Sequence, residues 1–340
     1  MRLHTAIDLF SGCGGLTLGL KRAGFNVIGA IEIDQLAAST YTRNHPGVRV
    51  WDKDIRKIKT REMMRSLGIH PGQLDLLAGC PPCQGFSSIR TRNQKTTTDK
   101  RNSLIFEFLR FVRAFRPKTI MMENVPGLTG YYRFKEFTDK LSAEGYEIEP
   151  NILNAADYGV PQRRRRLIVL GGLSGKIDFA IPSANRRTVR DAIGSMPPAG
   201  KSGDPLHDLK EIRSEKILKR IKKIPKNGGS RSALGKRGQL KCHIRCEGFR
   251  DVYGRMGWKD VAPTITSGCT NPSKGRFLHP VKNRAITLRE AALLQGFPRS
   301  YFFPSDKGKE SVAEMIGNAL PPEFIRRHAQ MIKSRLLAKA

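Results

Sequence analysis

Short apolar runs alternate with longer amphipathic segments over the first 172 residues of the chain. Short apolar runs predict strands and longer segments with one apolar face predict helices. A chain that alternates the two folds with helices on both faces of a mostly parallel sheet. We therefore predict a doubly wound α/β fold. The expected strands are Thr5–Phe10, Val27–Ile33, Arg49–Asp52, Leu74–Ala78, Thr119–Glu123, Glu147–Ile152 and Leu167–Gly171.

The segments between these strands carry apolar residues at helical spacing. The pattern is clearest in 104–115, where six apolar residues form one face. The expected helices are Gly15–Ala23, Gln35–Asn44, Arg61–Leu67, Leu104–Phe115 and Phe134–Glu144.

The sequence changes character after about Gly172, where Pro, Gly, Ser and basic residues dominate. Helices are expected only at Glu211–Lys223, at Arg289–Leu294 and after Pro321-Pro322, since Pro is tolerated in the first helical turn. We predict a large domain of residues 1–172 and 312–340, and a smaller, irregular domain of residues 173–311 with a variable part at about 173–255.

The chain is strongly basic, with 61 Lys and Arg against 30 Asp and Glu and a formal net charge of +31. Residues 173–255 alone hold 20 Lys and Arg against 8 Asp and Glu. Such a surplus attracts a polyanion, most often nucleic acid, although a basic surface kept for solubility is the alternative. Three arginines on the polar face of 104–115 are either solvated or in contact with DNA; they are Arg110, Arg113 and Arg116.

The apolar runs are far shorter than the roughly 20 residues that cross a bilayer, and no signal segment is recognised, so we expect a cytoplasmic protein without a membrane partner. Its six cysteines should then stay reduced. Cys80 and Cys83 could form a zinc site with Cys242 and Cys246, or a redox pair by themselves. The loose spacing and the Pro-Pro interior disfavour zinc, and no metal is expected.

A glycine turn follows the first expected strand in Asp8-Leu-Phe-Ser-Gly-Cys-Gly-Gly15. Gly12 and Gly14 let the backbone approach a ligand closely, and Glu32 after the second strand suits the hydroxyls of a ribose. A dinucleotide fingerprint would have glycine where this chain has Thr17, so an adenosine-bearing ligand without pyrophosphate fits better than NAD. The alternative is a tight strand–helix connection without a ligand.

Three further polar groups follow or precede strands of the predicted sheet. They are Cys83 in Gly79-Cys-Pro-Pro-Cys-Gln-Gly-Phe-Ser87, Glu123 in Glu-Asn-Val-Pro126, and the arginines of Gln162-Arg-Arg-Arg-Arg166. Sites in doubly wound folds form at the carboxyl ends of strands. Each group alone has a structural explanation, such as a buried thiol or a phosphate clamp, but their joint position at one sheet edge favours an active site.

These motifs in this order resemble the DNA (cytosine-5) methyltransferase family, over nearly the whole chain except about 173–255. The resemblance implies a Rossmann-like, S-adenosylmethionine-dependent methyltransferase fold. It implies methyl transfer to carbon 5 of a cytosine in a specific sequence of double-stranded DNA, by a restriction-modification or solitary enzyme. The motifs are Asp8–Gly15, Glu32, Pro82-Cys83-Gln84, Glu123-Asn124-Val125, Gln162–Arg166, Arg289-Glu290 and Gly317-Asn318.

The resemblance also implies roles for the catalytic residues. Cys83 would add to carbon 6 of cytosine, since a thiolate is strongly nucleophilic and leaves readily. Glu123 would share a proton with ring nitrogen 3, Arg166 would hold the carbonyl oxygen, and Arg164 would brace the site. Cys80 has no role in this scheme.

Other residues are assigned by the same resemblance. The cytosine must leave the duplex, and Gln84–Arg101 would be the loop that closes over it, with Ser87 near the vacated space. Residues 173–255 would recognise the target, through phosphate contacts that position and base contacts that specify. The DNA-binding candidates are Gln84, Ser87, Arg231 and Arg237. The S-adenosylmethionine pocket would comprise Phe10, Gly12, Gly14, Leu16, Glu32, Asp54, Pro82 and Asn318. Arg289 and Glu290 would be structural.

Three other functions remain open from the sequence. A family relative could methylate cytosine in RNA, although the large basic insert and Pro126 favour DNA. The chain could be a silent DNA-binding protein on this fold, or a thiol oxidoreductase that uses Cys80 and Cys83. We expect a monomer whose partners are double-stranded DNA and, functionally, a cognate restriction endonuclease.

Overall fold

The structure of the chain is a computed structural model that describes residues 3–82, 103–235, 239 and 251–338. These residues form two compact units. The first unit comprises residues 1–158, 165–182 and 320–340, and the second comprises 159–164 and 183–319. The division between the units therefore falls at 182/183 and 319/320. The sequence analysis placed the domain boundaries about ten residues earlier, at 172/173 and 311/312. The recognition role of the second region stays a prediction.

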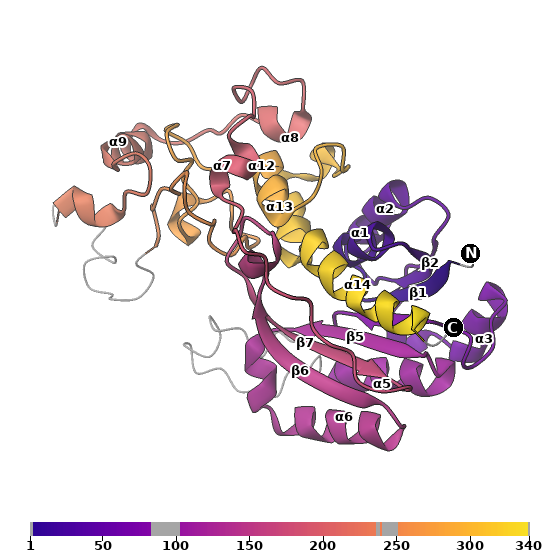
Figure 1. The fold of residues 1–340 in the computed structure, drawn as a ribbon. Coiled ribbons are helices and arrows are strands. Elements are labelled where there is room, and N and C mark those ends of the chain that lie inside the picture. The colour runs from indigo at the N-terminus through magenta and orange to yellow at the C-terminus, as the bar shows by residue number, and fades with distance from the viewer. Residues whose placement is uncertain (1–2, 83–102, 236–238, 240–250, 339–340) are drawn as a thin grey trace. The chain divides into compact units, whose positions relative to one another are not determined.

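A seven-stranded sheet forms the centre of the first unit, in the order β3-β2-β1-β4-β5-β7-β6 (Figure 1). β1 to β5 are parallel, whereas β7 is antiparallel to both β5 and β6. All seven predicted strands are confirmed, and with them the doubly wound fold. The strands are β1 (His4–Leu9), β2 (Phe25–Ile31), β3 (Arg49–Trp51), β4 (Leu76–Gly79), β5 (Thr119–Asn124), β6 (Glu147–Asn154) and β7 (Arg165–Gly172).

The helices of the first unit cover both faces of this sheet (Figure 1). α3, α5 and α6 contact one another in succession, and their side chains form one core with those of the strands, including Phe108 and Phe137. The C-terminal helix α14 packs against α1, where Gly19 is required because a Cβ there would lie 2.6 Å from the Ile325 Cβ. The helices are α1 (Gly15–Arg22), α2 (Gln35–Asn44), α3 (Thr60–Leu67), α5 (Leu104–Phe115), α6 (Tyr132–Ala143) and α14 (Pro322–Leu337).

The arginines on the polar side of α5 are partly exposed and also form hydrogen bonds with neighbouring segments. Arg110 donates to Glu107 and to the carbonyls of Ile55 and Ile58, which ties the segment after β3 to the helix. Arg113 and Arg116 both donate to Glu144, the first to its carboxylate and the second to its carbonyl. These arginines therefore hold neighbouring segments together.

The second unit contains short helices joined by long irregular segments. α9 begins at Glu215 rather than at the predicted Glu211, because the Glu211 carboxylate pairs with Arg213 and accepts the Ala285 amide. α13 was not predicted. The helices are α7 (Val189–Ile193), α8 (Pro205–Asp208), α9 (Glu215–Lys223), α12 (Leu288–Gln295) and α13 (Lys309–Asn318).

Two motif residues, Arg289 and Glu290, support this unit from within α12. Arg289 donates to Asp204 and to the Tyr301 carbonyl, and Glu290 forms a capping box with Thr287 and pairs with Arg284. Both side chains are buried, so the structural roles predicted for them agree with their contacts.

Candidate active site

The strand order reverses between β1 and β4, which are neighbours in the sheet although β2 and β3 lie between them in sequence. Ligands of doubly wound folds bind outside the carboxyl ends of the strands at such a switch point. The glycine turn follows β1 and the Cys80–Pro82 segment follows β4, so both motifs stand at the expected place.

The glycine turn has a left-handed backbone at Phe10, Gly12 and Gly14, with φ of 60°, 54° and 97°. The turn is closed by a bond of 3.0 Å from the Gly14 amide to the Ser11 carbonyl. A Cβ at Gly12 would meet no atom within 4 Å, so the space beside this residue is open to a ligand. Phe10 packs partly against the core, whereas Leu16 is buried in α1.

Glu32 connects the end of β2 to the glycine turn. One carboxylate oxygen accepts the Gly12 amide at 2.7 Å, and the other accepts the amides of Ile33 and Asp34 at 3.0 and 2.9 Å. Burial raises the pKa of this carboxyl, while the three amides act in the opposite direction. The carboxylate is therefore oriented in advance, and its remaining lone pairs could accept hydroxyl groups of a ligand.

A buried network that the sequence analysis did not recognise lies beneath the turn. The Thr17 hydroxyl donates to the Asp8 carboxylate at 2.7 Å and lies 2.7 Å from the Tyr41 hydroxyl. Burial raises the pKa of Asp8 to about 7. His45, directly after α2, bonds the Gly14 carbonyl at 3.1 Å. Thr17 thus replaces the glycine of a dinucleotide fingerprint with a side chain that links β1, α1 and α2.

Asp54, predicted to contact the cofactor, caps a short 3-10 helix, Ile55–Lys57. Its carboxylate also pairs with the Arg56 guanidinium, and this hydrogen bond holds the pKa of Asp54 below its usual range. Its predicted role is untested by these contacts.

The segment after β4 is tied to β1 and to the end of β5. The Cys80 amide donates to the Leu9 carbonyl at 3.1 Å, which extends the ladder between β1 and β4. The Asn124 side-chain amide donates to the Pro81 carbonyl at 3.0 Å. The Asn of the Glu-Asn-Val motif therefore positions the backbone that leads into Pro82 and Cys83.

Glu123 and Arg166 form an ion pair, with 2.8 Å between the carboxylate oxygen and Arg166 Nε. Because β7 runs antiparallel to β5, the beginning of β7 lies beside the end of β5, and Glu123 faces Ile168 in the register. Both side chains are largely buried, with 9% and 16% exposed. Arg166 also donates to the Arg165 carbonyl. Since a guanidinium carries five N–H donors, further donors remain for a substrate oxygen.

The Cys80 thiol lies beside this pair, and burial together with the negative charge of Glu123 raises its pKa well above the usual range. A thiol held in its neutral form is a poor nucleophile and a poor redox group. This environment disfavours Cys80 as the reactive cysteine.

Gln162 and Arg164 belong to the second unit and hold its backbone. Arg164 is 4% exposed and donates to the carbonyls of Ile265 and Gly317, each at 3.1 Å. Gln162 accepts the Ile265 amide at 2.8 Å and bonds Gln295. These contacts suit the bracing role predicted for Arg164, within its own unit.

The remaining predicted residues are only partly described. Cys83, Gln84, Ser87 and Arg237 lie outside the described residues. Arg231 is 7% exposed, so most of its side chain is packed within the second unit. Asn318, the last residue of α13, is exposed in the same unit. Their roles stay predictions.

No three metal-binding side chains converge in the described parts of the chain, although three of the four cysteines of the zinc alternative lie outside those parts. Burial raises the pKa of Cys13 and of Cys269 to about 12. No described helix is long and apolar enough to cross a bilayer.

Known proteins resemble this chain along nearly its whole length. It is 38% identical over 342 residues to the type II methylase M.HgiDII of Herpetosiphon aurantiacus. The aligned region covers 96% of this chain and 94% of that protein. It is 33% identical to the type II methyltransferase M1.HphI of Haemophilus parahaemolyticus, over 96% of this chain and 86% of the relative.

Solved structures share the fold. A prophage-encoded protein of E. coli superposes with a TM-score of 0.75 at 26% identity, over 99% of this chain and 100% of that one. The Entamoeba histolytica methyltransferase EhMeth, at 20% identity, superposes with a TM-score of 0.71 over 99% of both chains.

The profile of the C-5 cytosine-specific DNA methylases matches residues 4–334. That range contains every motif described above, from the glycine turn after β1 to Gly317-Asn318. The chain belongs to the C-5 cytosine-specific DNA methylase family and is a DNA (cytosine-5)-methyltransferase.

Proposed function

We propose that the enzyme methylates a flipped-out cytosine within a specific sequence of double-stranded DNA, using S-adenosylmethionine and a covalent bond to Cys83. The observation that carries the proposal is the Glu123–Arg166 ion pair at the carboxyl edge of the sheet, 2.8 Å long, beside the segment that leads to Cys83. An acid and a guanidinium on adjacent strands can together bind the ring nitrogen and the carbonyl oxygen of one pyrimidine.

The glycine turn fits the cofactor. Gly12 leaves open space and Glu32 presents an oriented carboxylate, which suits the ribose hydroxyls, while the partly buried Phe10 would contact the adenine. Residues Gly14, Leu16, Asp54, Pro82 and Asn318 would complete the pocket by family resemblance. When bound, S-adenosylmethionine supplies an electrophilic methyl group.

The chain's own residues would activate the base. The Cys83 thiolate adds to carbon 6 of cytosine, which breaks the aromatic system and makes carbon 5 nucleophilic. Glu123 shares a proton with nitrogen 3 and Arg166 stabilises the carbonyl oxygen, so both groups make carbon 6 more electrophilic. Loss of the carbon-5 proton and departure of the Cys83 thiolate then restore the aromatic ring.

Access to carbon 6 requires the cytosine to leave the stacked duplex, at a cost of a few kcal/mol. We assign Gln84 and Ser87 to the loop that would close around it, and the basic second region, including Arg231 and Arg237, to DNA contact. By its likeness to type II methylases, the enzyme would protect DNA from a cognate restriction endonuclease. We place the protein in the cytoplasm, as a monomer.

Methyl transfer can be tested with duplex DNA, single-stranded RNA and labelled S-adenosylmethionine. Label should enter the duplex DNA, and transfer mainly to RNA would refute the proposed substrate. Bisulfite sequencing of DNA from expressing cells would then identify the target sequence.

The nucleophile can be tested with two matched cysteine variants. Cys83→Ser should lose turnover by several orders of magnitude while it still binds S-adenosylmethionine, and Cys80→Ser should stay active because its thiol is held neutral. DNA with 5-fluorocytosine at the target should become covalently attached to the wild-type protein and not to Cys83→Ser. Equal behaviour of the two variants would show that Cys83 is not the nucleophile.

A further inference from the structure

α9 is an amphipathic helix whose apolar face is firmly packed in the second unit. Ile221 is fully buried and Ile217 partly buried, in a small core with Ile224, Val252, Tyr253 and Leu278. The rest of the helix faces outward. Its sequence, Glu-Lys-Ile-Leu-Lys-Arg-Ile-Lys-Lys, holds five cations and one acid in nine residues.

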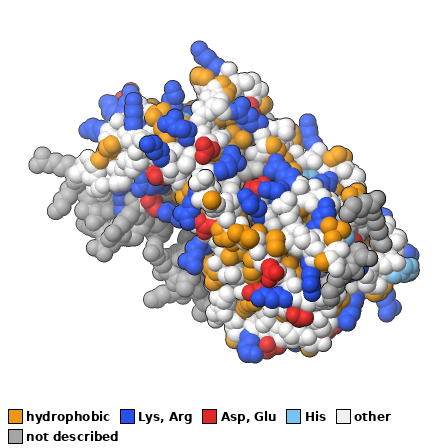
Figure 2. All heavy atoms as spheres, in the orientation of Figure 1, with side chains coloured by type: hydrophobic (Ala, Val, Ile, Leu, Met, Phe, Trp, Pro, Cys, Tyr) orange, Lys and Arg blue, Asp and Glu red, His pale blue; other side chains and the backbone are white. Residues whose placement is uncertain are grey.

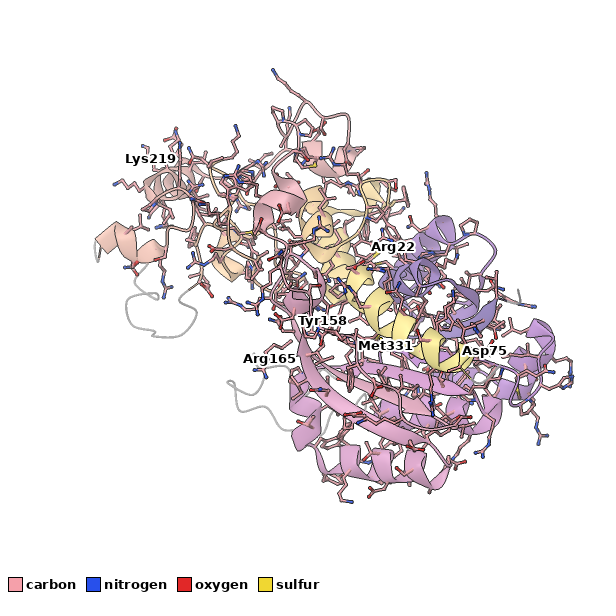
Figure 3. All side chains as sticks on the ribbon, viewed as in Figure 1. Arg22, Asp75, Tyr158, Arg165, Lys219 and Met331 are labelled. Atoms are coloured by element: carbon pink, nitrogen blue, oxygen red, sulfur yellow. The ribbon has the colours of Figure 1, made fainter. Side chains whose placement is uncertain are left out.

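The outward face of α9 carries cations that few acids neutralise in the described part of the chain. Lys216, Lys219, Lys222 and Lys223 are exposed, and Lys219, labelled in Figure 3, is 76% exposed. The only acid of the helix, Glu215, lies 3.6 Å from Lys219 and is itself 88% exposed.

α6 in the first unit shows the opposite arrangement. Lys135 lies 2.8 Å from Asp139 and Lys140 lies 2.7 Å from Glu136, so its lysines are paired along the helix. Figure 2 shows Lys and Arg side chains spread over the visible face, with few acids among them. Exposed lysines alone therefore do not distinguish α9 from α6. The difference is that most lysines of α9 have no partner acid among the described residues.

Arg255 holds α9 from inside the unit. Its fully buried guanidinium donates to the carbonyls of Ile221 and Ile224, each at 3.0 Å, and to groups of His279, Lys282 and Asn283. Among the described residues, no carboxylate forms an ion pair with it. A helix C-terminus carries partial negative charge that would repel phosphate, and a cation on its last carbonyls offsets that charge. Arg255 thus leaves the whole length of α9 attractive to an anion.

The spacing of the cations suits a nucleic acid backbone. Lys216, Lys219, Lys222 and Lys223 recur every three or four residues, so they form one stripe about 10 Å long at 1.5 Å per residue. Phosphates of one strand of B-DNA follow at about 3.4 Å along the axis, so the stripe spans roughly three such steps and can meet about four phosphates. Arg220 is also held against the Tyr253 ring, 5.4 Å from its centre.

We propose that α9 is a phosphate clamp, which holds the DNA backbone through Lys216, Lys219, Lys222 and Lys223 without reading sequence. Arg255 is its positioning residue. The proposal rests on the proposed function, since it takes double-stranded DNA as the substrate. The clamp would contribute to the affinity for DNA and not to the recognition of its sequence, because flexible lysines on a helix face bind phosphate as point charges.

The test is the salt dependence of DNA binding by the full-length protein with all four lysines replaced by glutamine. Each phosphate contact contributes about 0.9 to the slope of log Kd against log salt, so the slope should fall by up to about 3.6. Affinity should fall equally for target and non-target duplexes, while S-adenosylmethionine binding stays unchanged. A variant with the four lysines replaced by arginine should keep the slope, because its positive charges are retained.

A matched control replaces with glutamine four other exposed lysines, each within ion-pair distance of an acid: Lys59, Lys135, Lys176 and Lys307. Its net charge equals that of the α9 variant, and its slope should change by less than about 0.5. An unchanged slope in the α9 variant would overturn the clamp while leaving the methyltransferase proposal intact. Loss of affinity for the target duplex alone would overturn it too, since that result assigns α9 to base recognition. A wild-type protein that methylates no DNA would instead refute the proposed function.

Discussion

The two units of this methyltransferase satisfy their buried backbone groups in different ways. In the first unit, seven strands and their helices bond backbone to backbone around a core of aliphatic and aromatic side chains. In the second unit, buried polar side chains supply many of these bonds. Arg164 bonds two carbonyls, Gln295 bonds the carbonyls of Ile316 and Ala319, and Arg255 bonds four.

The difference follows from what each unit has to bury. Every buried backbone carbonyl needs a donor, and irregular segments cannot supply one from a neighbouring strand. Arginine meets this need with five donors in a fixed plane. A unit that departs from regular structure therefore depends on a few side chains, whereas the sheet depends on many equivalent bonds.

The largest predicted effect comes from replacing Arg255 with methionine. The buried carbonyls of Ile224 and His279 would lose their donor, whereas the Ile221 carbonyl keeps the Ile224 amide. Each buried, unsatisfied group costs about 1–3 kcal/mol, so we expect a loss of about 2–6 kcal/mol in the second unit. Hydrogen exchange should show faster exchange throughout residues 215–285 and little change in the strands.

Arg187→Met removes an exposed arginine of the same unit and should cost less than about 0.5 kcal/mol. If Arg255→Met were equally mild, the carbonyls would have other partners and the contrast between the units would be wrong. Unfolding of the strands together with 215–285 would show that the units do not unfold separately.

The sequence predicted the sheet well because burial on both faces makes strands apolar. Residues Thr119–Asn124 show this: the strand is buried along its whole length, and its end carries the motif acid Glu123. The places of Glu123 and Arg166 in the sheet were also predictable, since both residues lie at the ends of strands that apolar runs identify. Their mutual ion pair was not, because it depends on β7 being antiparallel to β5.

The supporting side chains could not be predicted from the sequence. Arg255 lies in a basic region where an arginine suggests surface or DNA, and only the fold shows that it is buried. Thr17 was interpreted as a missing glycine, although its hydroxyl bonds Asp8 and Tyr41. Near the end of α13, a Cβ at Gly317 would clash with the Ser267 amide at 2.4 Å; close packing, rather than helix propensity, explains this glycine.

The next prediction tests whether the glycine turn after β1 binds the cofactor or only reverses the chain. Gly12→Ala places a methyl group in open space at φ of 54°, which strains the backbone by about 1–2 kcal/mol. If S-adenosylmethionine approaches this backbone, its Kd should also rise at least about tenfold, or 1.4 kcal/mol. Calorimetric titration measures that change directly.

Gly68→Ala is the matched control, since Gly68 has φ of 65° and equally open surroundings but caps α3 instead. It should cost similar stability and leave the Kd unchanged. Equal affinities of the two variants would mean that the glycine turn is structural only.

A smaller effect concerns the pH dependence of the first unit. His328 on α14 lies among the rings of Tyr158, Phe179 and Phe324, and burial lowers its pKa to about 3. The unfolded chain binds a proton at this residue below about pH 6.5 and the folded chain does not. Stability from this residue therefore declines as the pH falls from about 6.5 towards 3, by about 1.4 kcal/mol per pH unit.

His328→Phe keeps an aromatic ring and removes the titration. The stability difference between the variant and the wild type should shift by about 1.4 kcal/mol per pH unit in favour of the variant between pH 6 and 4. Denaturant unfolding at several pH values measures it. A constant difference would mean that the fold accommodates protonated His328 in spite of its aromatic surroundings.

The smallest effect tests the buried side-chain network of Asp8, Thr17 and Tyr41 in the first unit. The Thr17 hydroxyl has one hydrogen, which it donates to Asp8, so the Tyr41 hydroxyl is left to donate to Thr17. Tyr41→Phe removes only this donor and should cost about 1 kcal/mol of stability. Because Thr17 lies in α1 directly after the glycine turn, the KM for S-adenosylmethionine should rise a few fold with little change in kcat. A lower kcat at unchanged KM would assign the network to the chemical step, and side-chain support would then matter for catalysis in the first unit as it does for architecture in the second.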